Sequence, residues 1–270
     1  MKIPSTWAWV SGLALVLGVA LGACGAAQGR EDVHRSMREF DLAVALHEEG
    51  NLPGALQHLQ KSLELDPENV RAHLLLGFIH NQREDLPLSE KYLREAVRLL
   101  EERPDMASLL AESRNMLGVV LIRKGEYAEA TELLKSAAGD MLNQAPWYAW
   151  GNLGWAYYEQ KKYKDAEDAL LEAIRVQPRF CLGFYWLGRV YFDQGQFEKA
   201  EEALTESLEV DARCGGFENQ RAWLLRGETR ARLGHRDDAI ADFERCMELG
   251  QRTEHGKACQ RFLAGPGGEQ

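Results

Sequence analysis

Six pairs of small residues recur along the chain in a single frame. The first members are Ala43, Gly77, Gly118, Gly154, Gly188 and Gly227. The second members follow at one constant spacing, at Ala55, Ser89, Ala130, Ala166, Ala200 and Ala239. The intervals between units are unequal, and the longer ones place extra residues at 104–110, 145–146 and 215–219. A period of this length predicts stacked supersecondary units, because no unit can bury its apolar face alone.

The skeleton is clearest in "NLGWAYYEQKKYKDAEDALLEAIRVQP", residues 152–178. It resembles the tetratricopeptide repeat, a helix–turn–helix unit of ~34 residues. The resemblance covers residues 36–253 and implies an all-α fold, a right-handed superhelix of six such repeats. A composition rich in Ala, Leu and Glu with only eight prolines also favours helices. For residues 254–270 we predict a short capping helix and a frayed tail, because the apolar outer face of a terminal repeat must be covered by a polar surface.

Glycine and proline mark the predicted helix ends. Gly50, Gly125, Gly195 and Gly234 fall between the two helices of a unit, where a left-handed helix end favours glycine. Two prolines, Pro53 and Pro87, fall in the first turn of a second helix, where the missing N–H costs little.

The N-terminal segment, residues 1–23, differs from the rest of the chain. Lys2 is followed by an uncharged run from Trp7 to Ala23. This run is shorter than the ~20 apolar residues of a membrane span and ends in small residues, which is typical of an export signal. "LGAC" at its end resembles the lipobox of bacterial lipoproteins. The resemblance implies cleavage before Cys24, with a diacylglycerol and an N-acyl chain on that residue and no other cofactor.

This interpretation divides the N-terminus into a signal peptide, residues 1–23, and a lipidated tether, residues 24–35. Two other interpretations stay open: an uncleaved anchor, or cleavage further on with loss of Cys24. Gly25 follows the cysteine, where an Asp retains enteric lipoproteins in the inner membrane. The absence of an Asp at this position indicates that the protein is held on the periplasmic side of the outer membrane. Sorting rules differ between bacterial groups, so the inner membrane is an open alternative.

Four further cysteines are Cys181, Cys214, Cys246 and Cys259. An exported protein meets an oxidising compartment, and four cysteines allow three connectivities. Cys181 and Cys214 lie close to one repeat length apart, at similar points of adjacent repeats. Cys246 lies on the last second helix, and Cys259 on the predicted cap. We expect the bridges Cys181–Cys214 and Cys246–Cys259; the alternative is that Cys246 only fills a small core position.

Aromatic residues follow the first helices at the offset expected for the concave side of the superhelix. They are Phe40, Phe78, Tyr148, Trp155, Tyr158, Tyr185 and Phe192. Exposed apolar surface with Tyr and Trp is typical of a binding site. We therefore expect a groove for an apolar or amphipathic polypeptide segment. The alternative is that these rings belong partly to the core or are covered by the tether.

The sequence carries no pattern typical of catalysis. Neither an HExxH motif, a Gly-x-Ser-x-Gly elbow, a phosphate loop nor a dinucleotide fingerprint occurs. His73 and His80 fall on one predicted helix, and His80 takes a core position, so we expect structural roles rather than a metal site. With 32 basic and 42 acidic residues, nucleic-acid binding is disfavoured. We expect no enzyme activity and no small-molecule substrate.

A lipobox followed by six repeats resembles the pilotin lipoproteins of type IV pilus systems. The opening of the fourth unit, "APWYAWGNLGWAYYEQ", shares in this resemblance, whereas the extra residues between units two and three and the C-terminal cysteines depart from it. The resemblance implies an assembly factor that binds the secretin, the outer-membrane channel of the pilus, and promotes its insertion and multimerisation. The alternative is a scaffold or adaptor for other envelope machinery, in outer-membrane protein assembly or with peptidoglycan enzymes.

Overall fold

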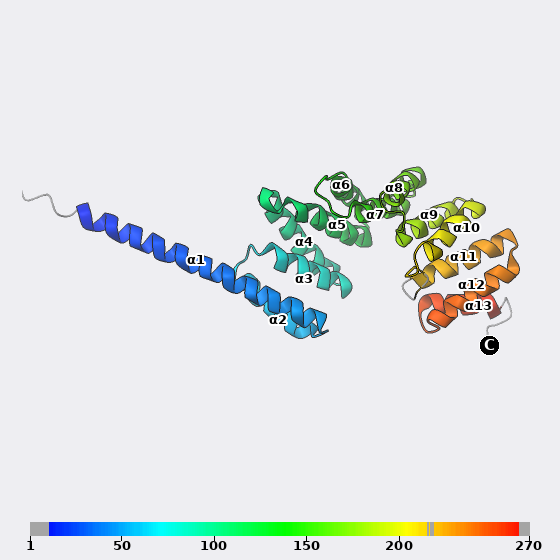
Figure 1. The fold of residues 1–270 in the computed structure, drawn as a ribbon, viewed down its shortest axis with the longest axis horizontal. Coiled ribbons are helices and arrows are strands. Elements are labelled where there is room, and N and C mark those ends of the chain that lie inside the picture. Colours follow the sequence, from blue (N-terminus) through cyan, green and yellow to red (C-terminus); the bar gives the residue numbers. More distant parts are fainter. Residues whose placement is uncertain (1–10, 215, 217–218, 265–270) are drawn as a thin grey trace, which may run out of the picture. The chain divides into compact units, whose positions relative to one another are not determined.

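The computed structural model describes residues 11–214, 216 and 219–264, with side chains from Gly29 onward. All the regular secondary structure in this part of the chain is helical, with no strand (Figure 1). The α-helices are α1 Ser11–Glu48, α2 Leu52–Leu65, α3 Val70–Gln82, α4 Leu86–Glu101, α5 Ala107–Lys124, α6 Tyr127–Ala138, α7 Pro146–Glu159, α8 Tyr163–Val176, α9 Cys181–Asp193, α10 Phe197–Glu209, α11 Gln220–Leu233, α12 Arg236–Leu249 and α13 Glu254–Ala264. The 3-10 helix η1, Pro104–Met106, precedes α5. The predicted all-α fold is confirmed.

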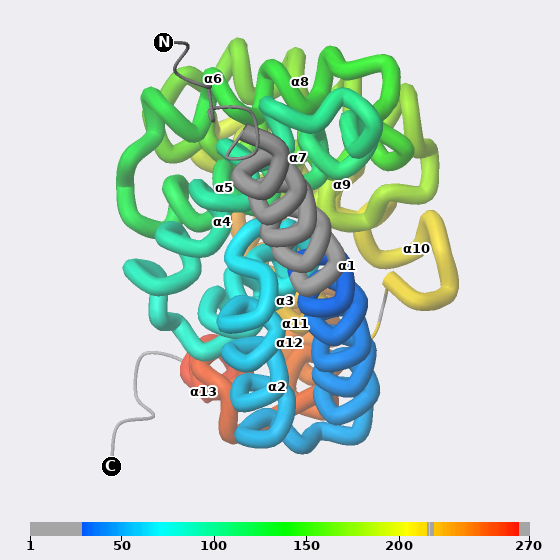
Figure 2. Tube along the Cα trace, turned by 90° about the vertical axis from the view of Figure 1, so that its left-hand side faces the viewer, coloured from blue at the N-terminus to red at the C-terminus, as the bar shows by residue number. Residues whose placement is uncertain are grey.

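The chain divides into two compact units, Met1–Leu99 and Leu100–Gln270. In the first unit α2 packs along α1, as Figure 2 shows, and α3 closes a core around Ala43, Leu59 and Leu76. In the second unit the helices pair in chain order, α5 with α6, α7 with α8, α9 with α10 and α11 with α12. These pairs are the predicted helix–turn–helix repeats.

The small residues of the repeat frame lie where the two helices of a pair touch. A Cβ added at Gly154 would lie 2.5 Å from Leu170 Cγ, and one at Gly188 would lie 2.6 Å from Leu204 Cγ. Gly77 and Gly118 meet leucines of α4 and α6 in the same way, and Gly227 meets Phe243. In each of these pairs, one large side chain of the second helix packs against the backbone at a glycine of the first helix. This contact sets the repeat frame.

The turns inside the pairs adopt the left-handed conformation predicted for their glycines. Gly50, Gly125, Gly195 and Gly234 have φ of 77°, 82°, 71° and 81°. The second and fourth pairs make the same turn without glycine, at Glu84 (φ 61°) and Lys161 (φ 59°). A side chain there strains the backbone, so the turn geometry comes from the packed pair rather than from local preference.

Both ends of the chain bear on the sequence predictions. The predicted cap is helix α13, which packs on α12. At the other end α1 runs without a break through Cys24 and residues 24–35 into the first repeat. None of the helices in the described ranges is both long and apolar enough to cross a membrane. Residues 1–10 of the predicted signal peptide lie outside the described residues.

Candidate functional site

The seven predicted groove residues divide between the two units. Phe40 is half-buried against the first unit's core, and Phe78 is 37% exposed, with its ring 6.0 Å from His47. The other five lie on neighbouring first helices of the second unit: Tyr148, Trp155 and Tyr158 on α7, and Tyr185 and Phe192 on α9. The candidate site is therefore built mainly by α7 and α9, which contact each other directly.

Trp155, Tyr158 and Trp186 form what we call the aromatic cluster. The rings of Trp155 and Trp186 stack with centroids 5.4 Å apart and an interplanar angle of 18°. Tyr158 also contacts Trp186, at 5.5 Å. All three side chains are half-buried, so part of each ring faces solvent. The sequence argument missed Trp186 because it lies outside the stripe offset that picked out the other rings.

Hydrogen bonds hold the polar ends of the cluster. The Tyr158 hydroxyl donates to Asp193 Oδ2 at 2.6 Å and accepts from Arg189 Nε at 2.9 Å. Burial, with a further contribution from the bond to Asp193, raises the pKa of Tyr158 to about 12. Trp155 Nε1 donates to Glu159 at 2.9 Å. The rings are thus fixed before any partner arrives, which lowers the entropy cost of binding.

Tyr185 is a correction to the sequence prediction. Its side chain is only 8% exposed and belongs to the core between α9 and α10. The Arg221 guanidinium of α11 covers the ring at 4.5 Å, and burial raises the pKa of the phenol. The next repeat therefore covers a position that spacing along a single helix assigned to the open face.

Arginines of α9 and α11 lie beside two of the aromatic rings. Arg232 lies 5.7 Å from the ring of Phe192, and Arg189 lies 5.9 Å from that of Tyr158. Phe192 is half-buried, and its ring also contacts Phe197 at 5.6 Å. Burial raises the pKa of nearby Glu228, whose carboxylate interacts with Arg189 and Arg232. Carboxylates of the chain offset these arginines, with Arg189 3.5 Å from Asp193 and both Arg189 and Arg232 near Glu228.

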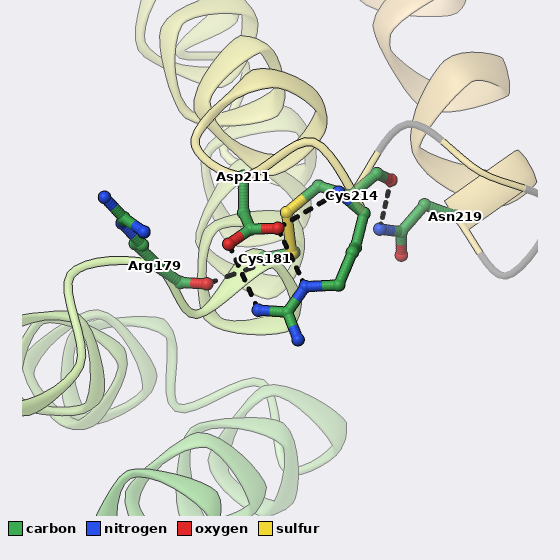
Figure 3. The surroundings of a disulfide bond; sticks show 6 residues. Arg179, Cys181, Asp211, Cys214 and Asn219 are labelled. Carbon is green, nitrogen blue, oxygen red and sulfur yellow. Dashed lines mark hydrogen bonds and ion pairs between the residues drawn. A yellow bond between two sulfur atoms is a disulfide. The ribbon is translucent and has the colours of Figure 1, made fainter.

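The four C-terminal cysteines are paired as the sequence predicted. Cys181 at the start of α9 is joined to Cys214 in the loop after α10, with Cα atoms 5.7 Å apart (Figure 3). Arg213 pairs with Asp211 and holds the pKa of that carboxyl well below its usual range, and the Asn219 amide donates to the Cys214 carbonyl. Residues 211–214, which follow α10, are therefore held by the disulfide, the ion pair and the Asn219 hydrogen bond.

The second bridge, Cys246–Cys259, joins α12 to the cap helix α13, with Cα atoms 6.4 Å apart. Both cysteines are fully buried. Gln220 supports the same end: its Nε2 donates to the Cys246 carbonyl at 2.6 Å and to the Gly250 carbonyl at 2.9 Å. The cap thereby becomes a fixed part of the last repeat.

The two candidate histidines lie in the core of the first unit. His73 Nε2 is 2.8 Å from the Pro67 carbonyl oxygen, and the His80 ring stacks on Tyr92 at 5.7 Å. Across the described ranges, no group of three or more His, Cys, Asp and Glu residues could hold a metal ion. The side chain of Cys24 lies outside the described residues, so its predicted lipidation stays a prediction.

Models of one repeat family match most of the array. The model described as TPR repeat matches residues 44–82, and models described as tetratricopeptide repeat match residues 110–138, 147–180 and 182–252. Among curated proteins, the chain is 31% identical over 93 residues to the mitochondrial tetratricopeptide repeat protein 19 homolog of Drosophila melanogaster, covering 31% of this chain and 25% of that protein. It is 32% identical over 137 residues to TPR repeat-containing protein PA4667 of Pseudomonas aeruginosa, covering 50% and 22%. The chain thus spans a quarter or less of the length of these relatives.

Proteins of type IV pilus biogenesis also match. The type IV pilus assembly protein PilF of Pseudomonas aeruginosa is 25% identical over 154 residues, which cover 55% of this chain and 56% of PilF. In fold, the chain is similar to PilW, described as a widely conserved type IV pilus biogenesis factor, with a TM-score of 0.71 and 22% identity over 84% of this chain and 98% of PilW. For the structure of Pseudomonas aeruginosa PilF the TM-score is 0.66, with 21% identity over 85% and 98%.

A third solved structure is the APC/C hetero-tetramer Cut9–Hcn1, with a TM-score of 0.68 and 14% identity over 88% of this chain and 45% of the other. At these identities the solved structures show the fold alone. The repeat models together match more than half of the sequence, so the chain belongs to the tetratricopeptide repeat proteins.

Proposed function

We propose that this protein is an outer-membrane lipoprotein that acts as a pilotin-like assembly factor for the type IV pilus secretin. The observation that carries the proposal is the match in fold to PilW and PilF, which extends over 98% of each of those chains. An array with fewer repeats would cover such relatives only in part, because each repeat adds one hairpin to the stack.

The anchor follows from the sequence around Cys24, where "LGAC" ends the apolar N-terminal run. Several acyl chains on one residue satisfy the rule that stable anchoring needs more than one chain. In this proposal the diacylglycerol and N-acyl groups hold the protein on the periplasmic side of the outer membrane, where a secretin subunit inserts.

The aromatic cluster is the part of the array that we expect to bind the subunit. Trp155, Tyr158 and Trp186 offer fixed, half-exposed rings, and large aromatic side chains supply most of the binding energy at protein interfaces. Phe192 with Arg232 extends the surface. The protein would hold an apolar or amphipathic secretin segment until the ring forms, which requires binding and no chemistry.

A deletion strain tests the proposal. Heat-resistant secretin multimers and pili should be lost, and the wild-type gene should restore both. A Trp155→Ala gene should restore them poorly, because the stack with Trp186 is gone. Leu171→Ala, which truncates an exposed apolar residue on α8, is the matched control and should restore them fully. Secretin multimers that persist in the deletion strain would refute the pilotin role.

The second candidate is a scaffold or adaptor for other envelope machinery, in outer-membrane protein assembly or with peptidoglycan enzymes. The similarity in fold to Cut9–Hcn1 supports this candidate, because a similar repeat array there belongs to an unrelated protein assembly. In that case the deletion strain would keep its secretin rings and change instead in cell shape or division.

A further inference from the structure

The loop between α6 and α7, residues 139–145, presents two adjacent large apolar side chains to water. Met141 is 98% exposed and Leu142 is 55% exposed. The loop lies between two repeats, and neither side chain belongs to the aromatic cluster. Exposed apolar residues in contiguous groups mark interaction sites more often than scattered single ones do. We call Met141 and Leu142 the apolar tip.

Hydrogen bonds within the loop fix the apolar tip in this position. Asp140 accepts the Leu142 N–H through Oδ1 at 2.9 Å and the Asn143 N–H through its carbonyl at 3.1 Å. The Asn143 side chain donates to the Ala137 carbonyl at 2.7 Å and accepts the Ala145 N–H at 2.9 Å. The exposure is therefore built into an ordered turn. Four backbone donors of the loop, those of Gly139, Leu142, Asn143 and Ala145, already have partners, which lowers the cost of moving the turn out of water.

The residues that follow the tip have the composition of a membrane interface. Pro146 begins α7, and the rings of Trp147 and Tyr148 come next, 5.6 Å apart. Tyr148 is 50% exposed, and its ring packs edge-on against Phe180 at 5.5 Å. Trp and Tyr are enriched where membranes meet water, because each has an apolar body and a polar end.

Cationic side chains lie near the same rings. Arg213 lies near Tyr148, and its side chain is largely exposed. Arg179 precedes Phe180 and acts on the same Asp211 carboxyl that pairs with Arg213. Arg213 already pairs with Asp211 through Nε and Nη2, so a lipid phosphate beside Tyr148 would be bound by its remaining Nη1 donors.

We propose that the apolar tip, with Trp147 and Tyr148 behind it, inserts shallowly into a lipid surface. Two side chains on an exposed turn offer little for a protein partner, since specific interfaces use about 20–30 residues on each side. A fluid lipid layer needs no matching shape. The tip adds a second lipid contact to whatever holds the N-terminus and does not depend on secretin binding.

Depth-dependent quenching tests this inference on the full chain, reconstituted in vesicles of phosphatidylethanolamine and phosphatidylglycerol. Met141→Cys, made together with Cys24→Ser, places a single reactive thiol on the tip, because the four C-terminal cysteines are paired. A nitrobenzoxadiazole label there should be quenched about twofold or more by lipids brominated on their acyl chains, because an inserted side chain reaches the acyl boundary. The same label on Arg245→Cys, an exposed position on α12, is the matched control and should stay in water.

Adding Leu142→Asp to the labelled chain separates insertion by the protein from insertion by the label. A carboxylate opposes entry into lipid, so quenching should fall to the level of the Arg245 label. Equal quenching at positions 141 and 245, or quenching that survives Leu142→Asp, would overturn the proposal. So would a label that stays open to aqueous iodide on vesicles and becomes shielded only when a partner protein is added.

Discussion

The first unit and the second unit use the same repeat frame but fill the space between neighbouring hairpins differently. Between α1, α2 and α3 lies a buried polar network. The Ser36 hydroxyl donates to the Ser62 carbonyl and the Ser62 hydroxyl donates to the Ser36 carbonyl, both at 2.9 Å. Asn69 Nδ2 donates to both hydroxyl oxygens at 3.0 Å. Asn69 thus ties α3 to the α1–α2 hairpin, whereas between α7 and α9 the contact from one hairpin to the next is made by stacked rings, Trp155 on Trp186.

This difference separates what holds the array from what makes it specific. In each hairpin a glycine or alanine meets one large side chain, and that contact fixes the pair. The positions between hairpins do not need this pairing of a small residue with a large side chain. A buried polar network at these positions fixes one register, and because its groups are all hydrogen-bonded to each other, none is available to bind a partner. Half-exposed rings fix the register less strictly and keep surface available for binding.

Tyr185 and Trp155 test this distinction within the second unit. Tyr185→Ala should lower the free energy of unfolding by about 3–4 kcal/mol, because it empties a buried site beneath Arg221. Trp155→Ala should cost much less stability, since its ring is already half in water, but should weaken partner binding more than tenfold. Urea denaturation and a pull-down of the secretin measure the two effects. Equal losses of stability would mean that Trp155 is also core.

Disulfides distinguish the two units, since Cys24 is the first unit's only cysteine. Replacing Cys246 and Cys259 by Ala should destabilise the C-terminal end of the second unit by about 3 kcal/mol, as expected for a bridge that closes a loop of this length. Hydrogen exchange should speed up in α12 and α13 and stay unchanged in α1 to α3. Reductant should produce this effect in the wild type as well, and should in addition open the Cys181–Cys214 bridge. Intact masses that are the same with and without reductant would show that no bridge forms.

The polar network of the first unit can be broken at Asn69. Asn69→Ala removes the donor shared by Ser36 and Ser62 and the cap that accepts the Ala72 N–H, and should cost about 2 kcal/mol. Asn51→Ala is the matched control, because Asn51 caps α2 in the same way on an exposed surface. It should cost about 1 kcal/mol or less. Equal losses in thermal unfolding would show that the buried bonds add nothing beyond the cap.

The sequence predicted the hairpins well because their determinants are local and repeated. Two small residues at a fixed spacing, with a left-handed glycine between them, are suited to a point where two helices turn back on each other. Chain separation also predicted Cys181–Cys214, since equivalent points of adjacent repeats lie side by side, and the expected packing of the cap on the last repeat predicted Cys246–Cys259.

What the sequence did not predict depends on neighbouring repeats. Tyr185 and Phe192 share a stripe on α9, yet Tyr185 is buried, with Arg221 of α11 4.5 Å from its ring, whereas Phe192 is only half-buried. Trp186 lies off that stripe and still joins the cluster, because Trp155 of α7 stacks on it. The exposed Met141 depends on a turn closed by Asp140 and Asn143, which no period marks.

The smallest predicted effect concerns the turns that lack glycine. Lys161 holds a left-handed φ of 59°, so Lys161→Gly should relieve strain and stabilise the second unit by about 0.5–1 kcal/mol, after the greater freedom of glycine in the unfolded chain is offset. Gly195→Ala is the reverse change at the same point of the next repeat. A Cβ there meets no atom within 4 Å, so its cost of about 1 kcal/mol would come from the backbone alone. Thermal unfolding of the two variants should shift in opposite directions. Destabilisation by both would mean that the Lys161 side chain, not the backbone, holds the fourth hairpin.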